Sequence, residues 1–156
     1  MASITGRTAN FLSTRLDPVV RALARNQVRL FRLTHGRLFN KFLRKPALVI
    51  DVVGRSSGEP RPVMLMRIER GDDFVVCGSN GGNPRTPNWY RNLQAAGEAF
   101  VEIPGERIET TFREVTEADE RAECWALLTA GYPDFASYQE LTDRVLPIGL
   151  LERITA

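Results

Sequence analysis

The sequence predicts a mainly β fold with helices toward its two ends, built as a closed or partly open antiparallel barrel. Five or six short, apolar, β-branched runs lie between residue 47 and the C-terminus. Turns that contain Gly, Pro or Asp separate most of these runs by only a few residues, and such short connections favour hairpins. Helical patterns precede and follow the runs, so we expect helices around one antiparallel sheet.

The first 45 residues form a separate electrostatic unit. They carry ten Lys or Arg and one acid, Asp17, whereas the remainder carries eleven Lys or Arg and eighteen acids. The net charge of +2 for the 156-residue chain therefore combines +9 in this segment with −7 in the rest. We expect residues 1–45 to be a basic helical extension of the domain at 46–156, and we expect the barrel to fold without residues 1–40.

The extension is predicted to form an amphipathic helix. Asp17 and Pro18 suit the cap and first position of a helix, and Gly36 suits its end. Apolar residues share one face of a helical wheel and arginines share the opposite face. The apolar set is Val19, Val20, Leu23, Ala24, Leu30 and Phe31, and the basic set is Arg21, Arg25, Arg29 and Arg32. A second short amphipathic stretch, 37–45, ends before Pro46.

Three interpretations of this helix stay open. It can pack on the barrel and leave its basic face in water. It can instead make a peripheral contact with an anionic membrane surface, as basic amphipathic helices do. Nucleic acid is disfavoured, because no recognisable reader motif or stacking pattern accompanies the arginines.

The strands follow in order from residue 47. They are predicted at 47–53, 62–69, 74–77, 99–103 and 107–115, with a last strand in PIGLLERI, 147–154. Gly54 and Gly58 suit the turn between the first two strands, because glycine tolerates positive φ. We find no internal repeat and no linker, so a single domain is expected.

Three helices are predicted within this domain. Residues 88–92 open a short helix after Pro87. Thr116 and Asp119 resemble a capping box that starts a helix running to about Ala130. Pro133 ends that helix, and a short one follows at 134–143.

Composition excludes several classes of site. A chain with 43% hydrophobic and 26% charged residues is typical of a soluble globular domain. Cys77 and Cys124 lie far apart without metal-type spacing, and we expect reduced thiols in or near the core of a cytoplasmic protein. His35 is the only histidine, which disfavours a His-based metal site or a Ser-His-Asp triad. No run reaches the roughly 20 apolar residues of a spanning helix, and no signal peptide is recognisable.

No metal site is predicted, so any chemistry has to come from a cofactor. Three polar segments are candidates for holding it. The turn 54–61 carries two arginines and two serines, which suit an anion, although a solvated turn explains them too. The segment 79–82 ends in two glycines that can bring backbone N–H groups to a ligand or form a plain turn. The segment 88–92 contains Trp89, which can be a wall of the site or part of the core.

The order of these segments resembles the deazaflavin (coenzyme F420)-dependent nitroreductase and quinone reductase family, relatives of the flavin-reductase split-barrel proteins. The likeness covers about residues 46–152. It rests on GRSSGEPR, on SNGG followed by two prolines and WYRNL, on Glu120-Arg121 and Trp125, and on YPDFASYQELTDR and PIGLLE. The resemblance implies a split β-barrel with an N-terminal helix. It also implies coenzyme F420 as the cofactor, an 8-hydroxy-5-deazaflavin with a phospholactyl-oligoglutamate tail.

The resemblance further implies the site residues. The matching cofactor positions are Arg55, Ser56, Ser57, Arg61, Pro62, Val63, Met64, Leu65, Met66, Cys77, Gly78, Ser79, Asn80, Asn88, Trp89, Tyr90, Arg91 and Asn92. The matching acceptor-side positions are Tyr132, Phe135 and Tyr138, and the candidate catalytic donors are Ser79, Tyr132 and Tyr138. Residue chemistry agrees, since an anionic tail favours arginines and a flat apolar ring favours strand residues 63–66.

Two positions depart from the family pattern. Ser56 stands where members often have Lys or Arg, which removes one positive charge near the tail; Arg85 or Arg91 can compensate. Phe135 stands where members often have tyrosine, and this predicts a more apolar acceptor pocket.

The leading functional hypothesis is an oxidoreductase that transfers hydride from reduced coenzyme F420 to a small electron-poor acceptor: a quinone, an enone or a nitro compound. One alternative is a non-catalytic carrier of the deazaflavin or of a lipid at the membrane surface. Another is a split-barrel reductase that uses FMN, which the tail-directed arginines disfavour. No nucleic acid partner is expected, and both a monomer and a homodimer remain open.

Overall fold

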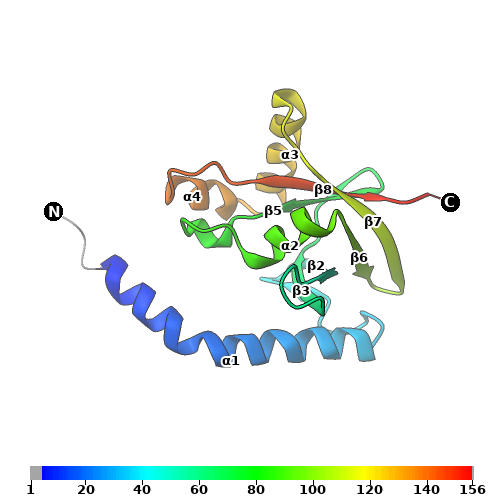
Figure 1. Ribbon diagram of the computed structural model, residues 1–156, viewed down its shortest axis with the longest axis horizontal. Coiled ribbons are helices and arrows are strands. Elements are labelled where there is room, and N and C mark those ends of the chain that lie inside the picture. Colours follow the sequence, from blue (N-terminus) through cyan, green and yellow to red (C-terminus); the bar gives the residue numbers. More distant parts are fainter. Residues whose placement is uncertain (1–4, 156) are drawn as a thin grey trace.

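The computed structural model describes residues 5–155, with side chains from residue 18 onward. Its strands form one curled antiparallel sheet in the order β1-β2-β6-β7-β8-β5-β4, with β3 paired to β2. The strands are β1 (Lys41–Phe42), β2 (Lys45–Val53), β3 (Pro60–Met66), β4 (Glu69–Arg70), β5 (Asp73–Cys77), β6 (Glu98–Ile103), β7 (Glu106–Glu114) and β8 (Ile148–Arg153). The helices are α1 (Thr5–Leu33), the single 3-10 turn η1 (Asn80–Gly82), α2 (Asn88–Ala96), α3 (Ala118–Gly131) and α4 (Asp134–Glu140). The predicted split-barrel class is confirmed (Figure 1).

Most predicted strands agree with the structure to within two residues. The exception is the predicted strand 62–69, which ends at Met66; Glu69 and Arg70 then form the separate strand β4 beside β5. The stretch 37–45 forms bends and half of the tight hairpin between β1 and β2, and Pro46 lies inside β2. The predicted last helix stops earlier than expected, at Glu140.

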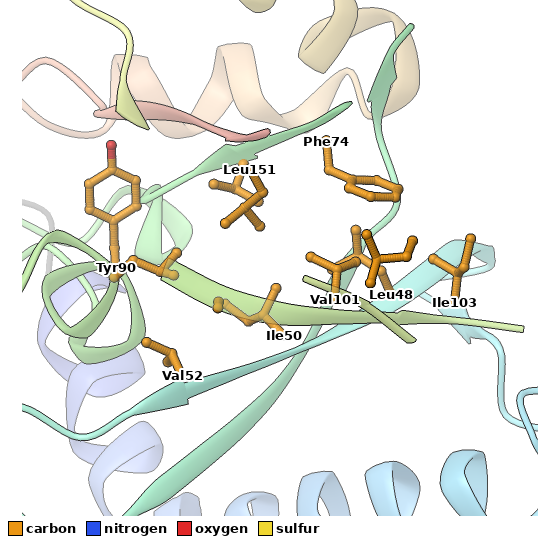
Figure 2. Close-up of a cluster of buried hydrophobic side chains, with 12 residues drawn as sticks. Leu48, Ile50, Val52, Phe74, Tyr90, Val101, Ile103 and Leu151 are labelled. Atoms are coloured by element: carbon orange, nitrogen blue, oxygen red, sulfur yellow. The ribbon is translucent and has the colours of Figure 1, made fainter. Parts of the chain in front are cut away.

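The position of β2 explains why most of its residues are apolar. Leu48, Ile50 and Val52 point into the barrel, where they pack with residues of β5, β6 and β8 (Figure 2). The alternate residues Ala47 and Val49 are buried on the other face, in a cluster with side chains of α1. Because successive strand residues point to opposite faces, a strand covered on both sides needs a continuous apolar run.

A second part of the core lies beneath α3 and α4. Leu128 and Phe135 from these helices pack with Val75 and with both cysteines, Cys77 and Cys124. Both cysteines are free and buried, which confirms the prediction of reduced core thiols.

The start of the N-terminal helix was predicted wrongly. It begins at Thr5, so Asp17 and Pro18 lie inside α1 and not at its cap. A proline inside a helix removes one hydrogen bond and bends the axis, and Figure 1 shows α1 changing direction in its first half. The predicted end is confirmed, because Gly36 has a φ of +73° and its N–H bonds the Phe31 carbonyl at 2.8 Å.

Among the described side chains of α1, from Pro18 onward, those of the last turns dock on the barrel. Val28 and Phe31 are buried, and Arg32 forms a two-pronged ion pair with the buried Glu102, at 2.6 Å from Nη2 and 3.1 Å from Nε. Val19 and Leu23, from the predicted apolar face, are 56% and 63% exposed. The predicted packing face is therefore partly wrong, because the earlier turns extend past the sheet (Figure 1).

The other helix boundaries follow local chemistry. α2 starts directly after Pro87, as predicted, and ends at Gly97, which has a φ of +71°. α3 starts after Glu117, and no side chain caps it, so the predicted capping box of Thr116 and Asp119 is wrong. The acidic residues in the first turn of α3 instead stabilise the helix, because they interact with the positive end of its dipole.

Two kinds of feature are absent from the described residues. None of their helices is long and apolar enough to cross a bilayer. The side chains of residues 18–155 include no group of three or more His, Cys, Asp or Glu arranged for a metal ion.

Candidate functional site

An apolar cavity of about 280 Å³ lies between the sheet and the helices α3 and α4. It is lined by Phe42, Leu43, Leu65, Met66, Ile68, Val75, Val76, Cys77, Ser79, Asn80, Gly81, Trp89, Leu128, Tyr132, Phe135 and Tyr138. A largely apolar cavity with a few polar groups is typical of sites that hold flat organic molecules. Nine of the residues assigned to the cofactor or the acceptor meet in it.

Three aromatic side chains form the helical wall of the cavity. Tyr132 and Phe135 meet edge to face with ring centroids 5.4 Å apart, and Tyr138 lies 6.1 and 6.3 Å from them. The hydroxyls of Tyr132 and Tyr138 are hydrogen-bonded at 3.2 Å. This bond, together with the nearby Asp134, raises the pKa of Tyr132, so its phenol stays protonated and able to donate.

The loop 78–83 forms a second wall of the cavity beside α4, and Arg144 holds its backbone. The guanidinium donates to the carbonyls of Gly78, Ser79 and Asn83 at 3.0, 2.8 and 2.9 Å. The backbone of Gly82 has a φ of +77°, and a Cβ there would meet the Tyr138 carbonyl at 2.7 Å. Glycine is thus required where the loop meets α4.

Two further hollows adjoin this cavity around the start of α2. One lies along the turn 54–62 and shares Trp89 with the cavity; it includes Arg55, Ser56, Ser57, Arg61, Pro62, Val63, Asn88 and Asn92. The other lies along the loop 80–91 and shares Asn80 with the cavity; it includes Arg85 and Arg91. The two hollows both include Asn88 and together carry four arginines, so we refer to them jointly as the groove beside the apolar cavity.

The arginines of this groove have no acidic partner among the described side chains. Arg55 is fixed by asparagines, donating to Asn92 Oδ1 at 2.7 Å and to Asn88 Oδ1 at 3.1 Å. Among the described side chains, Arg61, Arg85 and Arg91 form no ion pair with a carboxylate. Unpaired guanidiniums along one groove suit a ligand that carries several negative charges.

Three predicted cofactor positions lie outside these hollows. Met64 is buried against α1, and Tyr90 is fully buried in the barrel core (Figure 2). Gly78 packs against Tyr90, which a Cβ would meet at 3.0 Å. Contact of these three residues with the cofactor stays a prediction, and their positions in the fold do not support it.

Sequence reasoning missed other residues of the site. Phe42 and Leu43 belong to the N-terminal segment that was predicted to be an extension, and only the folded hairpin brings them to the cavity. Ile68 and Leu128 were predicted only as strand and helix residues. Arg144 stands in the quoted segment YPDFASYQELTDR, but its contact with residues 65 and 66 positions earlier is invisible in the sequence.

The fold and the site together define a split-barrel oxidoreductase that uses a flat, flavin-like cofactor with an anionic tail. The chain belongs to the F420H(2)-dependent quinone reductase family, whose model matches residues 23–153.

Known proteins of this kind are similar along most of the chain. An F420H(2)-dependent quinone reductase of Mycobacterium tuberculosis is 28% identical over 127 residues, which are 80% of this chain and 85% of that protein. The solved structure of an F420-H2 dependent reductase is 35% identical, with a TM-score of 0.64 over 69% of this chain and 94% of that one. Another solved structure, a domain-swapped dimer, is 31% identical, with a TM-score of 0.67 over 86% of this chain and 99% of that one.

These similarities confirm the main predictions. The protein is an F420-dependent oxidoreductase, and coenzyme F420 is its cofactor. The alternatives of an FMN-dependent reductase and of a non-catalytic carrier are not favoured.

Proposed function

We propose that this protein reduces a quinone with reduced coenzyme F420, and that the apolar cavity is where the two molecules meet. The observation that carries the proposal is the hydrogen-bonded pair of Tyr132 and Tyr138, which borders the same cavity as Ser79 and the strand residues Leu65 and Met66. One wall thus offers hydroxyl donors, while the other offers a flat apolar surface.

The residues around the cavity fit the cofactor in two parts. The tail, with its phosphate and carboxylates, matches the groove of Arg55, Arg61, Arg85 and Arg91, which lack acidic partners among the described side chains. The ring system matches the apolar surface beside Trp89. When bound and reduced, the coenzyme supplies a hydride and favours two-electron chemistry over radicals.

The side chains then have defined tasks toward the acceptor. A phenol of the Tyr132–Tyr138 pair donates a hydrogen bond to the acceptor oxygen on which negative charge develops. The apolar walls exclude water and hold the reacting atoms in contact. Ser79 is buried at the loop and is a further donor candidate.

Phe135 favours a quinone or conjugated enone over a nitro compound as the acceptor. It is 9% exposed and its ring contacts the rings of both tyrosines. A phenylalanine stacks on a flat ring but cannot donate a proton, so the wall is more apolar than one with a third phenol.

Two measurements test this function. Fluorescence titration should show binding of coenzyme F420 and much weaker binding of FMN, since FMN lacks the oligoglutamate tail. Steady-state assays with the reduced coenzyme should show turnover of a quinone. Tight F420 binding without turnover of any quinone or enone would leave the carrier hypothesis in its place.

Assembly and location are further proposals. The exposed apolar side chains Val19, Val20 and Leu23 on α1 support either a homodimer or a peripheral contact with anionic membrane by a cytoplasmic protein. Light scattering of the full chain, with and without Leu23→Asp, distinguishes a dimer from a monomer. Sedimentation with anionic vesicles tests the membrane contact, and no sedimentation in any lipid removes it.

A further inference from the structure

The hairpin between β1 and β2 has an unusual backbone. The two strands pair up to Phe42 and Lys45, so Leu43 and Arg44 alone make the turn. Both have a positive φ, +48° and +65°. Two-residue turns with both residues in the left-handed region are normally built from Asn and Gly. Leucine and arginine are strained there, because Cβ crowds the backbone carbonyl.

Local contacts of the two residues do not explain this strain. Leu43 is 56% exposed, and Arg44 is exposed, with no side-chain hydrogen bond or ion pair to the rest of the described chain. The hairpin itself is nevertheless held firmly. Phe42 packs against two hydrophobic clusters, and the Lys41 carbonyl accepts a hydrogen bond from Gln27 at 3.0 Å. A strained turn on a well-supported hairpin points to a function.

The position of the turn indicates that function. Leu43 lines the apolar cavity and is also largely exposed, so it lies at the cavity mouth. We propose that Leu43 is a specificity-determining residue, which contacts an apolar substituent of the hydride acceptor where it leaves the cavity. The strained turn aims this side chain at the mouth. The inference rests on the proposed function, in which the acceptor occupies this cavity.

The variant Leu43→Asn tests the contact without endangering the fold, since asparagine adopts the left-handed conformation readily. Two quinones with the same ring are compared, one carrying an alkyl chain and one unsubstituted. For the alkyl quinone we expect the KM to rise about tenfold with little change in kcat, because the variant loses one apolar contact between leucine and the alkyl chain. The KM of the unsubstituted quinone should stay unchanged.

Leu38→Asn is the matched control, because Leu38 is a similarly exposed leucine in the same segment that does not line the cavity; it should change neither KM. A second variant, Arg44→Gly, tests the strain and should raise the Tm by about 2–4 °C.

The outcomes separate the inference from the function on which it rests. If Leu43→Asn leaves both KM values unchanged, or raises both equally, Leu43 does not select the acceptor. An unchanged Tm in Arg44→Gly would show that the turn is not strained, and would contradict the claim that strain aims Leu43 at the cavity mouth. If the wild-type protein reduces neither quinone, the proposed function fails first, and the inference falls with it.

Discussion

Tyr132, Phe135 and Tyr138 come from one short segment, and their grouping was expected from the resemblance of YPDFASY to a known family. Their chemistry was not visible in the sequence, because the hydroxyl pair at 3.2 Å depends on how α4 folds back after Pro133. Leu43 and Arg144 were missed for the same reason, since their partners lie far away in the chain. Residue types thus suggested an anion site at the turn 54–61, and the family resemblance suggested the donors, while the contacts that support these residues required the fold.

Substitution of Arg61 should weaken cofactor binding without affecting the fold. Arg61 is exposed in the groove and free of a carboxylate partner within residues 18–155. Loss of one charge-assisted contact to the anionic tail should raise the F420 dissociation constant about tenfold in Arg61→Ala. Arg37→Ala, another exposed arginine outside the groove, should leave it unchanged. Equal affinities of wild type and Arg61→Ala would show that the tail binds elsewhere.

The pH dependence of turnover should reflect the phenol pair. Its hydrogen bond with Tyr138 and the nearby Asp134 raise the pKa of Tyr132. A raised pKa keeps the Tyr132 phenol protonated to higher pH. We therefore expect kcat to stay level up to about pH 9, because this pH is still below the usual tyrosine pKa of about 10. A decline of kcat with an apparent pKa near 7–8 would mean that another group supplies the proton.

Phe135→Tyr should widen the range of acceptors. The added hydroxyl restores a third phenol at the cavity wall and can hydrogen-bond a nitro oxygen. We expect a clear rise in kcat/KM for a nitroaromatic compound and little change for a quinone. Unchanged rates for both acceptors in Phe135→Tyr and also in Tyr132→Phe would indicate that this wall does not face the acceptor.

Strands and helices differ in how well they could be predicted. The strand β2 was found easily, because burial of both faces gives the consecutive apolar residues 47–50 and, after Asp51, two valines. The start of α1 was missed because Asp17-Pro18 is a good helix start by local chemistry, yet a longer helix accommodates the proline with a bend. Val19 and Leu23 are exposed, although they belong to the face that was predicted to pack on the barrel. Amphipathic periodicity shows that a helix has an apolar face, but it does not show what covers that face.

Because the last turns of α1 dock on the barrel, we expect only the earlier part of the N-terminal extension to be dispensable for stability. Removal of residues 1–24 leaves Phe31 and the Arg32–Glu102 ion pair in place, so the Tm should change little. Removal of residues 1–34 exposes Val49 and Met64 and should lower the free energy of unfolding by more than about 3 kcal/mol, as loss of a buried phenylalanine does. Denaturant unfolding of both truncated forms and of the full chain measures these differences in the free energy of unfolding. Equal stabilities would show that α1 is a separate extension.

The complete molecule combines a basic N-terminal segment with an acidic barrel that keeps one arginine-rich groove. Composition alone predicted the charge division and disfavoured metal and triad chemistry. It could not place the groove, because Arg55, Arg61, Arg85 and Arg91 converge only when the hairpin of β2 and β3 packs beside α2. The order of short motifs identified the family and its cofactor, since several segments far apart in sequence have to match together.

The central claim is that one cavity holds the cofactor ring on one side and presents the Tyr132–Tyr138 pair to the acceptor on the other. A single-turnover, stopped-flow measurement tests it directly, by mixing the protein and reduced F420 with a quinone and following oxidation of the coenzyme. In Tyr132→Phe/Tyr138→Phe the hydride-transfer rate should fall at least about tenfold, the cost of one lost donor to developing charge. The F420 dissociation constant should stay at the wild-type value. An unchanged transfer rate, or loss of F420 binding in this variant, would contradict the assignment of the phenol pair to the acceptor.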